Sequence, residues 1–213
     1  MITEEQISKN RDLYIDILES VDREGIDNLI KFIKTTDFFE APASTIYHNN
    51  FKGGLCLHSI NVYYNALKVA EGFYEQIPMD SLKVACLLHD ISKADFYELY
   101  IQNKKNYNAN GASKDTAGRF DWVTVERYKV RDSMDRPFVY GDHGTNSYMI
   151  ASKFIKINEA EACAIINHHM ALDNAPVRQD ISEIYNRHPL ATVVHVADTL
   201  ATYITENPYM INE

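Results

Sequence analysis

The first 36 residues carry apolar side chains at the spacing of amphipathic helices. Residues 3–6, Thr-Glu-Glu-Gln, have the pattern of a capping box, in which two side chains satisfy backbone N–H groups at a helix start. A second helix is expected to begin near Asp22 or Arg23 and to end around Thr36. The pattern therefore predicts an N-terminal helical pair over residues 1–36.

Helical spacing returns near residue 53 and continues, with one interruption, to about residue 205. Asn158 with Glu161 predicts a second capping box, and Pro189 suits the first turn of the last helix. Loops are expected over residues 37–53 and around Pro176, and a frayed end after residue 207. The helices expected from these patterns cover residues 53–76, 80–90, 92–102, 144–155, 159–169, 180–186 and 189–205.

The interruption, residues 103–142, has a different pattern. Asn, Lys, Gly, Ser and Asp dominate it up to Gly118, and β-branched and aromatic residues then alternate over residues 122–130. Such alternation is typical of a β-strand, and residues 137–140 are expected to form the return strand after a polar turn. We expect an all-α protein with an inserted β-hairpin around residues 120–140, preceded by a long functional or mobile loop.

Composition places the chain among folded globular proteins. Its 213 residues suit one domain, 46% of them are hydrophobic, and glycine and proline are sparse. The formal net charge of −9 argues against broad, non-specific binding to nucleic acid, which needs a basic surface. This charge is compatible with a small anionic substrate that is held by a few local cations.

The sequence also bears on location. It shows no signal-peptide pattern, and no apolar run approaches the roughly 18 residues of a membrane span. Cys56, Cys86 and Cys163 lie far apart in apolar helical contexts, and they form no Cys-x-x-Cys pair. Reduced core thiols fit this arrangement best. We therefore expect a cytoplasmic protein that does not associate with membranes.

An apolar run from Val84 to Leu88 leads directly into the adjacent pair His89 and Asp90. Burying a carboxylate without a partner is costly, and a bound cation would supply that partner. Imidazole and carboxylate together suit Mn, Fe, Zn or Mg. The alternative is an ordinary helix end, where His89 meets the last carbonyl groups and Asp90 is hydrated. This stretch alone does not decide between the two.

Other histidines also stand in short polar segments at predicted helix boundaries. A single one, such as His58, is more often a packed core residue than a ligand. His195 and Asp198 lie three residues apart on one face of the last predicted helix. The ordered set is more specific than any member, and it comprises His58, His89, Asp90, His143, His168, His169 and Asp198.

This order resembles the HD-domain superfamily of metal-dependent phosphohydrolases, whose motif is a histidine, then an adjacent His-Asp pair, then a distant aspartate. The resemblance covers residues 50–205 and implies one HD-type helical bundle, in which one divalent metal is held by His58, His89, Asp90 and Asp198. The chain is also similar to members with two further histidine sites and a second metal. On that resemblance His143 and His169 complete the second site, and His168 is the alternative to His169.

The resemblance also implies the chemistry. One or two divalent ions, among Mn, Fe, Mg, Ni, Co and Zn, would acidify a water molecule and polarise a phosphoryl oxygen. A small phosphorylated substrate is expected, with a nucleotide or a short oligonucleotide in first place. Lys93 resembles the family's lysine that meets a substrate phosphate, and Asp90 and Lys93 are the expected catalytic pair. The alternative for Lys93 is a surface lysine near a helix end. Asp142 is a candidate partner of His143 or a general acid.

Basic residues in and before the expected hairpin are further candidates for substrate contacts. Arg119 and Lys129 are the expected substrate-binding residues, and Arg127 and Arg131 stand beside them in the sequence. A hydrated strand face is the simpler explanation of all four.

Two other classes of function fit a similar scaffold. Mixed-valent di-iron oxygenases also use histidines and a bridging aspartate, and iron content with oxygen-dependent turnover would distinguish them. A degenerate domain would bind a nucleotide or a partner without catalysis, and the intact set of six expected ligands argues against it. No motif identifies the substrate or the oligomeric state.

Overall fold

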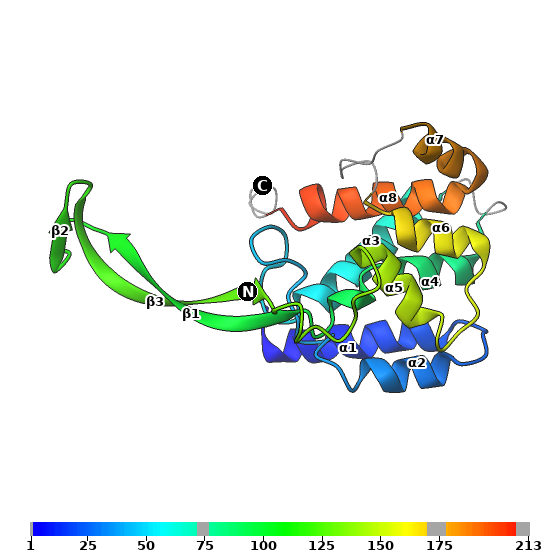
Figure 1. Ribbon diagram of the computed structural model, residues 1–213, viewed down its shortest axis with the longest axis horizontal. Helices are drawn as coiled ribbons and strands as arrows, with labels where there is room; N and C mark the ends of the chain where they lie inside the picture. Colours follow the sequence, from blue (N-terminus) through cyan, green and yellow to red (C-terminus); the bar gives the residue numbers. More distant parts are fainter. Residues whose placement is uncertain (1, 72–76, 170–177, 208–213) are drawn as a thin grey trace.

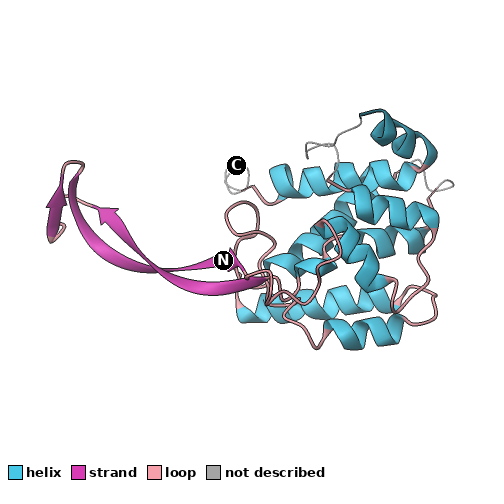
Figure 2. Ribbon diagram, in the orientation of Figure 1, coloured by secondary structure: helices cyan, strands magenta, loops and turns pink. Residues whose placement is uncertain are grey.

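A computed structural model describes residues 2–71, 77–169 and 178–207 of the chain (Figure 1). These residues form a helical body and a long β-ribbon that projects from it, called the arm below (Figure 2). The helical body is therefore as predicted, whereas the expected β-hairpin around residues 120–140 is replaced by a three-stranded insertion over residues 97–130. The third helix stops at Val69, before the expected end at residue 76. Residues 72–76, the loop around Pro176 and the end after residue 207 lie outside the described residues.

Eight α-helices make up most of the described body. The capping boxes predicted at Thr3 and Asn158 are both confirmed. A short 3-10 helix and a π-helix complete the body. The helices are α1 (Glu4–Glu19), α2 (Ile26–Ile33), α3 (Gly54–Val69), α4 (Met79–Leu88), η1 (Ile91–Lys93), α5 (His143–Ala151), α6 (Glu159–Asn167), α7 (Arg178–Arg187), α8 (Pro189–Leu200) and the π-helix η2 (Ala201–Thr205).

Helices α3 and α4 occupy the middle of the body. Helix α3 packs against α1, α4 and α8, and α6 packs against α4, α5 and α8. Leu55, Leu87 and Ile165 from these helices are fully buried. The Tyr14 hydroxyl of α1 donates a hydrogen bond to the Leu87 carbonyl at 2.9 Å. This contact fixes the end of α4 immediately before His89.

A buried ion pair joins the segment before α2 to the start of α6. The two terminal nitrogens of Arg23 lie 2.6 and 2.7 Å from the two carboxylate oxygens of Glu161. Glu161 has no solvent exposure and also completes the cap of α6. Because the carboxylate is removed from water, Arg23 is the positive charge that compensates it.

The arm is built from β1 (Tyr97–Tyr107), β2 (Ser113–Asp115) and β3 (Gly118–Val130) in the order β1-β3-β2. Strands β1 and β3 are antiparallel, with Tyr97 opposite Val130 and Tyr107 opposite Phe120. The predicted strand over residues 122–130 is part of β3, but the expected return strand over residues 137–140 is wrong. The real partner of β3 is the preceding segment, which was expected to be a helix and a loop.

The remaining expectations about location are tested only in part. None of the described helices is both long and apolar enough to cross a lipid bilayer. The three cysteines are free thiols, and Cys56 and Cys86 are buried as expected. Burial raises the pKa of both thiols above the ordinary value, so they are poor nucleophiles.

Candidate metal centre

The predicted metal ligands meet inside the helical body, although they are spread over 141 positions of the sequence from His58 to Asp198. His58 lies in the second turn of α3, and His89 and Asp90 follow the end of α4. His143 begins α5, His168 and His169 follow α6, and Asp198 lies in α8. Most of these residues therefore lie at or next to helix ends. Five of them are almost completely buried, namely His58, His89, Asp90, His168 and Asp198.

One half of the cluster contains the residues of the resemblance motif. The His58 Nε2 atom lies 3.1 Å from Asp198 Oδ1 and 3.7 Å from Asp90 Oδ2. The His89 Nε2 atom lies 3.4 Å from His58 Nε2 and 3.3 Å from Asp90 Oδ2. Two imidazoles and two carboxylates thus converge on one small volume, which is the donor set expected for a divalent cation.

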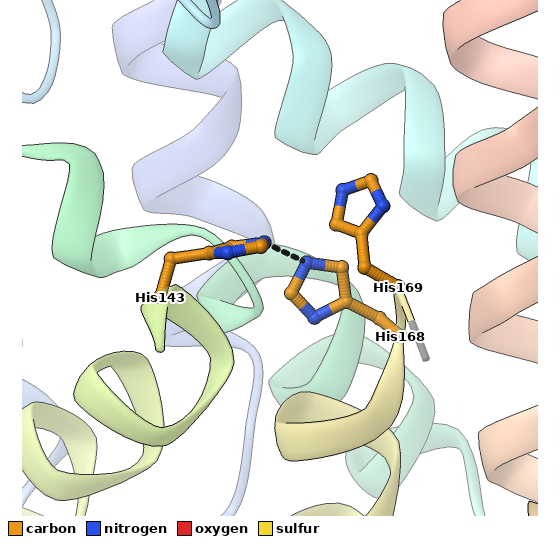
Figure 3. Close-up of side chains that lie close together, drawn as sticks. All are labelled: His143, His168 and His169. Atoms are coloured by element: carbon orange, nitrogen blue, oxygen red, sulfur yellow. Dashed lines mark hydrogen bonds between the residues drawn. The ribbon is translucent and has the colours of Figure 1, made fainter. Parts of the chain in front are cut away.

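The other half contains three histidines, whose rings face one another in Figure 3. His143 Nε2 lies 3.1 Å from His168 Nε2. His168 Nε2 lies 3.6 Å from Asp90 Oδ1, and His169 Nε2 lies 3.5 Å from Asp198 Oδ2. His168 and His169 were expected as alternatives, but both rings face the cluster. Which of them binds a second metal stays a prediction.

Hydrogen bonds on the outer side of two imidazoles orient their inner nitrogens. His89 Nδ1 lies 2.8 Å from the Cys86 carbonyl, and His168 Nδ1 lies 2.7 Å from the Ile165 carbonyl. A carbonyl can only accept, so each Nδ1 carries a proton. In the neutral ring Nε2 then has a lone pair that points into the cluster. Outer contacts of this kind are typical of histidines that bind metals.

Two carboxylate oxygens at the centre lack hydrogen bonds from the described residues. Asp90 Oδ1 and Asp198 Oδ1 are buried and accept no hydrogen bond of acceptable geometry from that part of the chain, although Asp198 Oδ1 lies near His58. Unpaired buried carboxylate oxygens are costly. Inward lone pairs of His89 and His168 add to this concentration of acceptors. The residues present therefore fit one or more divalent cations.

The electrostatics of the metal-free site lead to the same conclusion. Burial alone would lower the pKa of His58, but the Glu206 and Asp198 carboxylates outweigh it and raise the pKa to about 10. Burial opposes ionisation of Asp90, but Lys93 and His89 hold its pKa well below the usual range. The pKa of Asp198 is lowered as well, chiefly by His58 against the effect of burial. The site thus favours anionic carboxylates that are neutralised by nearby positive charge.

Lys93 has a partner that sequence reasoning did not provide. Its Nζ atom lies 2.7 Å from Asp90 Oδ2, and its side chain is 12% exposed. Burial opposes the charge, but Asp90 raises the pKa of Lys93 above its ordinary value. The alternative given for Lys93, a surface lysine near a helix end, is therefore wrong, because the side chain is largely buried against Asp90. Its expected contact with substrate phosphate stays a prediction.

Glu206 is a site residue that the sequence analysis missed. Its two carboxylate oxygens lie 3.1 and 3.2 Å from His58 Nδ1, and Asn61 donates a hydrogen bond to one of them at 2.9 Å. Glu206 is 7% exposed and follows the π-helix η2, where its N–H bonds to the Ala201 carbonyl five residues earlier. The carboxylate orients His58 so that Nε2 faces Asp90 and Asp198. No local pattern distinguishes this glutamate from the other acidic residues.

His48 is a second residue that the sequence analysis missed. Its ring lies 4.6 Å from the His58 ring, and neither ring nitrogen has a hydrogen-bond partner among the described residues. Burial, followed by repulsion from His58, lowers the pKa of His48 to about 3. His48, His58 and Glu206 bring ligand atoms close enough together to hold a cation. His48 lies in the loop expected over residues 37–53, where no helical or strand pattern singled it out.

The close approach of α5 and α6 depends on a glycine. A Cβ atom at Gly144 would lie 2.5 Å from the Ile166 carbonyl oxygen and 2.8 Å from that of Ile165. Only glycine lets the start of α5 pack this closely against the end of α6. This contact brings His143 within hydrogen-bonding distance of His168.

A pocket of about 320 Å³ opens beside the cluster. Its lining includes Lys93, His143 and Arg136, with the aromatic rings of Phe96 and Tyr97. The Arg136 guanidinium lies 5.4 Å from the centre of the Phe96 ring, and its buried Nε has no hydrogen-bond partner in the described part of the chain. Arg136 was read from the sequence only as part of a polar turn. The pocket therefore offers two cations and two aromatic surfaces next to the candidate metal ligands.

The other predicted site residues have different contacts. The Asp142 carboxylate caps α5 by accepting a hydrogen bond from the Thr145 N–H at 2.7 Å. His195 Nδ1 lies 2.6 Å from the His168 carbonyl, so its ring supports the chain after α6. These contacts place both residues at the edge of the cluster.

The predicted basic residues lie on or beside the arm and do not meet the cluster. Arg119 pairs with β2 at the end of the arm that is distant from the body, and it donates to the Gly111 carbonyl (Figure 1). Lys129 forms an exposed ion pair with Glu98, Arg127 lies opposite Tyr100, and Arg131 donates to the Tyr97 carbonyl. The hydrated strand face given as the simpler alternative agrees with these positions.

Comparison with known proteins adds a family to this geometry. Residues 57–203, more than half of the chain, match the family model described as HD domain. Comparison with curated proteins and with solved structures found no match. The family consists mostly of metal-dependent phosphohydrolases, and the histidine and aspartate clusters fit metal binding. From the matched residues and the ordered histidine and aspartate positions within them, we conclude that the chain belongs to the HD-domain family.

Proposed function

We propose that the protein is a metal-dependent phosphohydrolase that acts on a phosphoester, with a nucleotide or a short oligonucleotide as the substrate class. The observation that carries this proposal is the position of the cationic, aromatic pocket at the edge of the buried histidine and aspartate cluster. A cluster of this kind without a pocket would equally suit a purely structural metal. The pocket provides space for a substrate beside the ligands.

The cluster supports this function through its donor atoms. Asp90 lies between the two halves, with Oδ2 toward His89 and Oδ1 toward His168. Asp90 is therefore suited to share a carboxylate between two ions. When bound, divalent cations supply Lewis acidity and make water a usable nucleophile at neutral pH. Burial, followed by repulsion from His168, lowers the pKa of His143 to about 2, so this ring stays neutral and keeps a nitrogen lone pair that can bind a cation.

The pocket supports a phosphorylated, aromatic substrate. Lys93 and Arg136 provide a point charge and a planar donor set for phosphate oxygens. The rings of Phe96 and Tyr97 line the same pocket and provide apolar contact for a nucleobase. A divalent cation would compete with Lys93 for Asp90, which would release the Lys93 ammonium to a substrate oxygen. The arm residues Arg119 and Lys129 are not part of this proposal.

The first test is elemental analysis of protein purified without chelator, followed by phosphoester hydrolysis with added Mn, Mg, Ni, Co, Fe or Zn. Lys93→Met and Arg136→Met should each lower turnover at least tenfold at unchanged metal content, because each removes a cation from the phosphate site. Lys129→Met is the matched control, since it removes a lysine from the exposed arm and should leave turnover unchanged. Full turnover in both pocket variants would contradict the proposal.

The same measurements test the other classes of function. Iron content with oxygen consumption and no phosphate release would replace the hydrolase with a di-iron oxygenase. Nucleotide binding without turnover under any metal would leave a non-catalytic binding domain. A cytoplasmic location and the lack of broad nucleic-acid binding stay predictions from the sequence.

A further inference from the structure

The most exposed large hydrophobic side chains of the arm lie on one of its two faces, whereas Tyr100, Val123 and Val125 on the other face are half-buried. Cross-strand partners share a face of a ribbon, and successive side chains alternate between the faces. We call one of these faces the apolar arm face; it carries the odd-numbered residues of β1 and the even-numbered residues of β3. Its exposed large hydrophobic members are between 45% and 71% exposed, and they are Leu99, Ile101, Tyr107, Trp122 and Val130.

The opposite face of the arm is more polar. It carries Glu98 opposite Lys129, and Gln102 opposite Val125. An alternating pattern of this type is the pattern of a sheet that buries one face against a core. The described body does not cover the apolar arm face, because the arm projects away from the helices (Figure 1). The exposed apolar side chains lie toward both ends of this face, on either side of Asn103, Thr124 and Glu126, and such exposed apolar surface marks an interaction site.

The charge of the apolar arm face favours a protein partner over a nucleic acid. Lys105 is the one cation that this face carries within β1 and β3, and its Nζ pairs with Asp115 and lies 4.5 Å from the centre of the Phe120 ring. Single-stranded nucleic acids bind where free cations follow the phosphates alongside the aromatic rings. This face lacks that row of cations. Its apolar side chains suit the surface of a folded protein.

We infer that the apolar arm face of one chain packs on the helical body of a second copy, and that the arm of that copy packs in return on the first. Residues 97–130 contain six lysines and arginines against four acidic residues, whereas the rest of the chain contains 15 against 26. The arm as a whole and the body therefore carry opposite net charges, which favours the approach of two copies, while Lys105 and Glu126 cancel on the apolar arm face itself. An exchange of this kind closes as a symmetric dimer, the commonest assembly of identical chains.

The dimensions of the arm agree with this exchange. An 11-residue strand such as β1 is about 36 Å long, and a 16-residue helix such as α3 is about 24 Å long. The arm is therefore long enough to cross the body of a second copy. A two-stranded ribbon of this length is about 10 Å wide, so two exchanged contacts bury roughly 1,400 Å² in total, which is within the range of stable interfaces. The body also has exposed apolar side chains to receive it, among them Ile46, Tyr47 and Met134.

Two adjacent residues of β1 give a matched test with the full chain. Ile101 is 71% exposed on the apolar arm face, and Gln102 points to the opposite face. In analytical ultracentrifugation the unmodified protein should have twice the 24.4 kDa mass of one chain. Ile101→Arg should weaken this association at least tenfold, because it buries a charge in the contact, and Gln102→Arg should not change it. Leu99→Arg is a second variant on the same face, and circular dichroism checks that each variant is folded.

Trp122 provides an independent measurement, because it is the only tryptophan of the chain and lies on the apolar arm face. Its emission should shift to shorter wavelength as protein concentration rises, and this shift should be lost in Ile101→Arg. A photo-crosslinking residue in place of Ile101 should attach to the helical body of the second copy. The inference is overturned by a monomer up to about 100 µM, the range of weak association, by crosslinks to the partner arm alone, or by a Trp122 response to added oligonucleotide instead of protein concentration.

Discussion

Replacing Glu206 with glutamine tests whether an uncharged acceptor can still orient His58 for metal binding. The carboxylate oxygens of Glu206 lie 3.1 and 3.2 Å from His58 Nδ1, and both residues are buried, so water screens the contact little. Glutamine keeps an oxygen that can accept the Nδ1 proton but removes the negative charge. Removing outer partners of metal-binding histidines costs about 10–100-fold in metal affinity, or about 1.4–2.7 kcal/mol. We expect Glu206→Gln to weaken Mn²⁺ or Zn²⁺ binding by this factor.

Titration of the chelator-treated protein with metal, in competition with a chromophoric chelator, measures the affinity. Glu159→Gln is the matched control, because the Glu159 side chain is 86% exposed near the start of α6 and its loss should leave affinity unchanged. Nuclear magnetic resonance of the histidine nitrogens gives a second readout. The pKa of His58, raised to about 10 largely by Glu206, should fall in the glutamine variant. Unchanged metal affinity together with an unchanged His58 titration would refute the role of Glu206.

Three further predictions follow from the same structure. Asp90→Ala should abolish tight metal binding and leave the helical circular dichroism signal largely intact; undiminished metal content would remove Asp90 from the centre. Arg23→Met should lower the free energy of unfolding by about 3–5 kcal/mol, because it leaves the buried Glu161 carboxylate unpaired. Lys52→Met, which breaks an exposed ion pair, should cost less than about 1 kcal/mol in the same denaturation experiment, and equal losses would contradict the difference. In the presence of a chelator, the melting temperature should fall as the pH drops below about 6.5. The pKa of His143 is lowered to about 2 in the folded protein, so at these pH values only the unfolded chain binds a proton at this residue and is stabilised by it. A melting temperature that does not change with pH would contradict this.

The predictions that succeeded depended on short-range signals. The capping boxes at Thr3 and Asn158 involve side chains three residues apart, so four consecutive residues contain the whole interaction. The order of the histidines and aspartates was also visible in the sequence, and the family match supports the resemblance drawn from it. The order of these residues did not indicate how their side chains are arranged in space.

The arm was mispredicted because its pairing is decided at long range. Phe96, Leu99 and Tyr100 have helical spacing, whereas Tyr97, Leu99 and Ile101 have the alternation of a strand. Both patterns are present over these few residues, and pairing with β3 up to 33 positions later selects the strand. The expected helix therefore stops at Lys93, and the polar segment that followed it became part of the same strand.

The sequence predicted which residues form the site, but it did not predict how their side chains contact one another. His168 and His169 are adjacent, and no sequence pattern indicated that the chain after α6 would turn both rings inward. Glu206 reaches His58 across 148 positions, and this contact depends on how η2 packs against α3. A residue whose role is to support another residue has no chemical signature in the sequence.

The π-helix η2 has a consequence for how this site can change between related chains. A turn with one extra residue displaces everything that follows it, and here the next residue is Glu206. Deleting one residue from 201–205 would rotate Glu206 by about 100° around the helix axis, away from His58. The carboxylate contact of His58 is therefore controlled by chain length as well as by residue identity. A chain that keeps every histidine and aspartate but lacks this insertion would lose the contact without a single substitution.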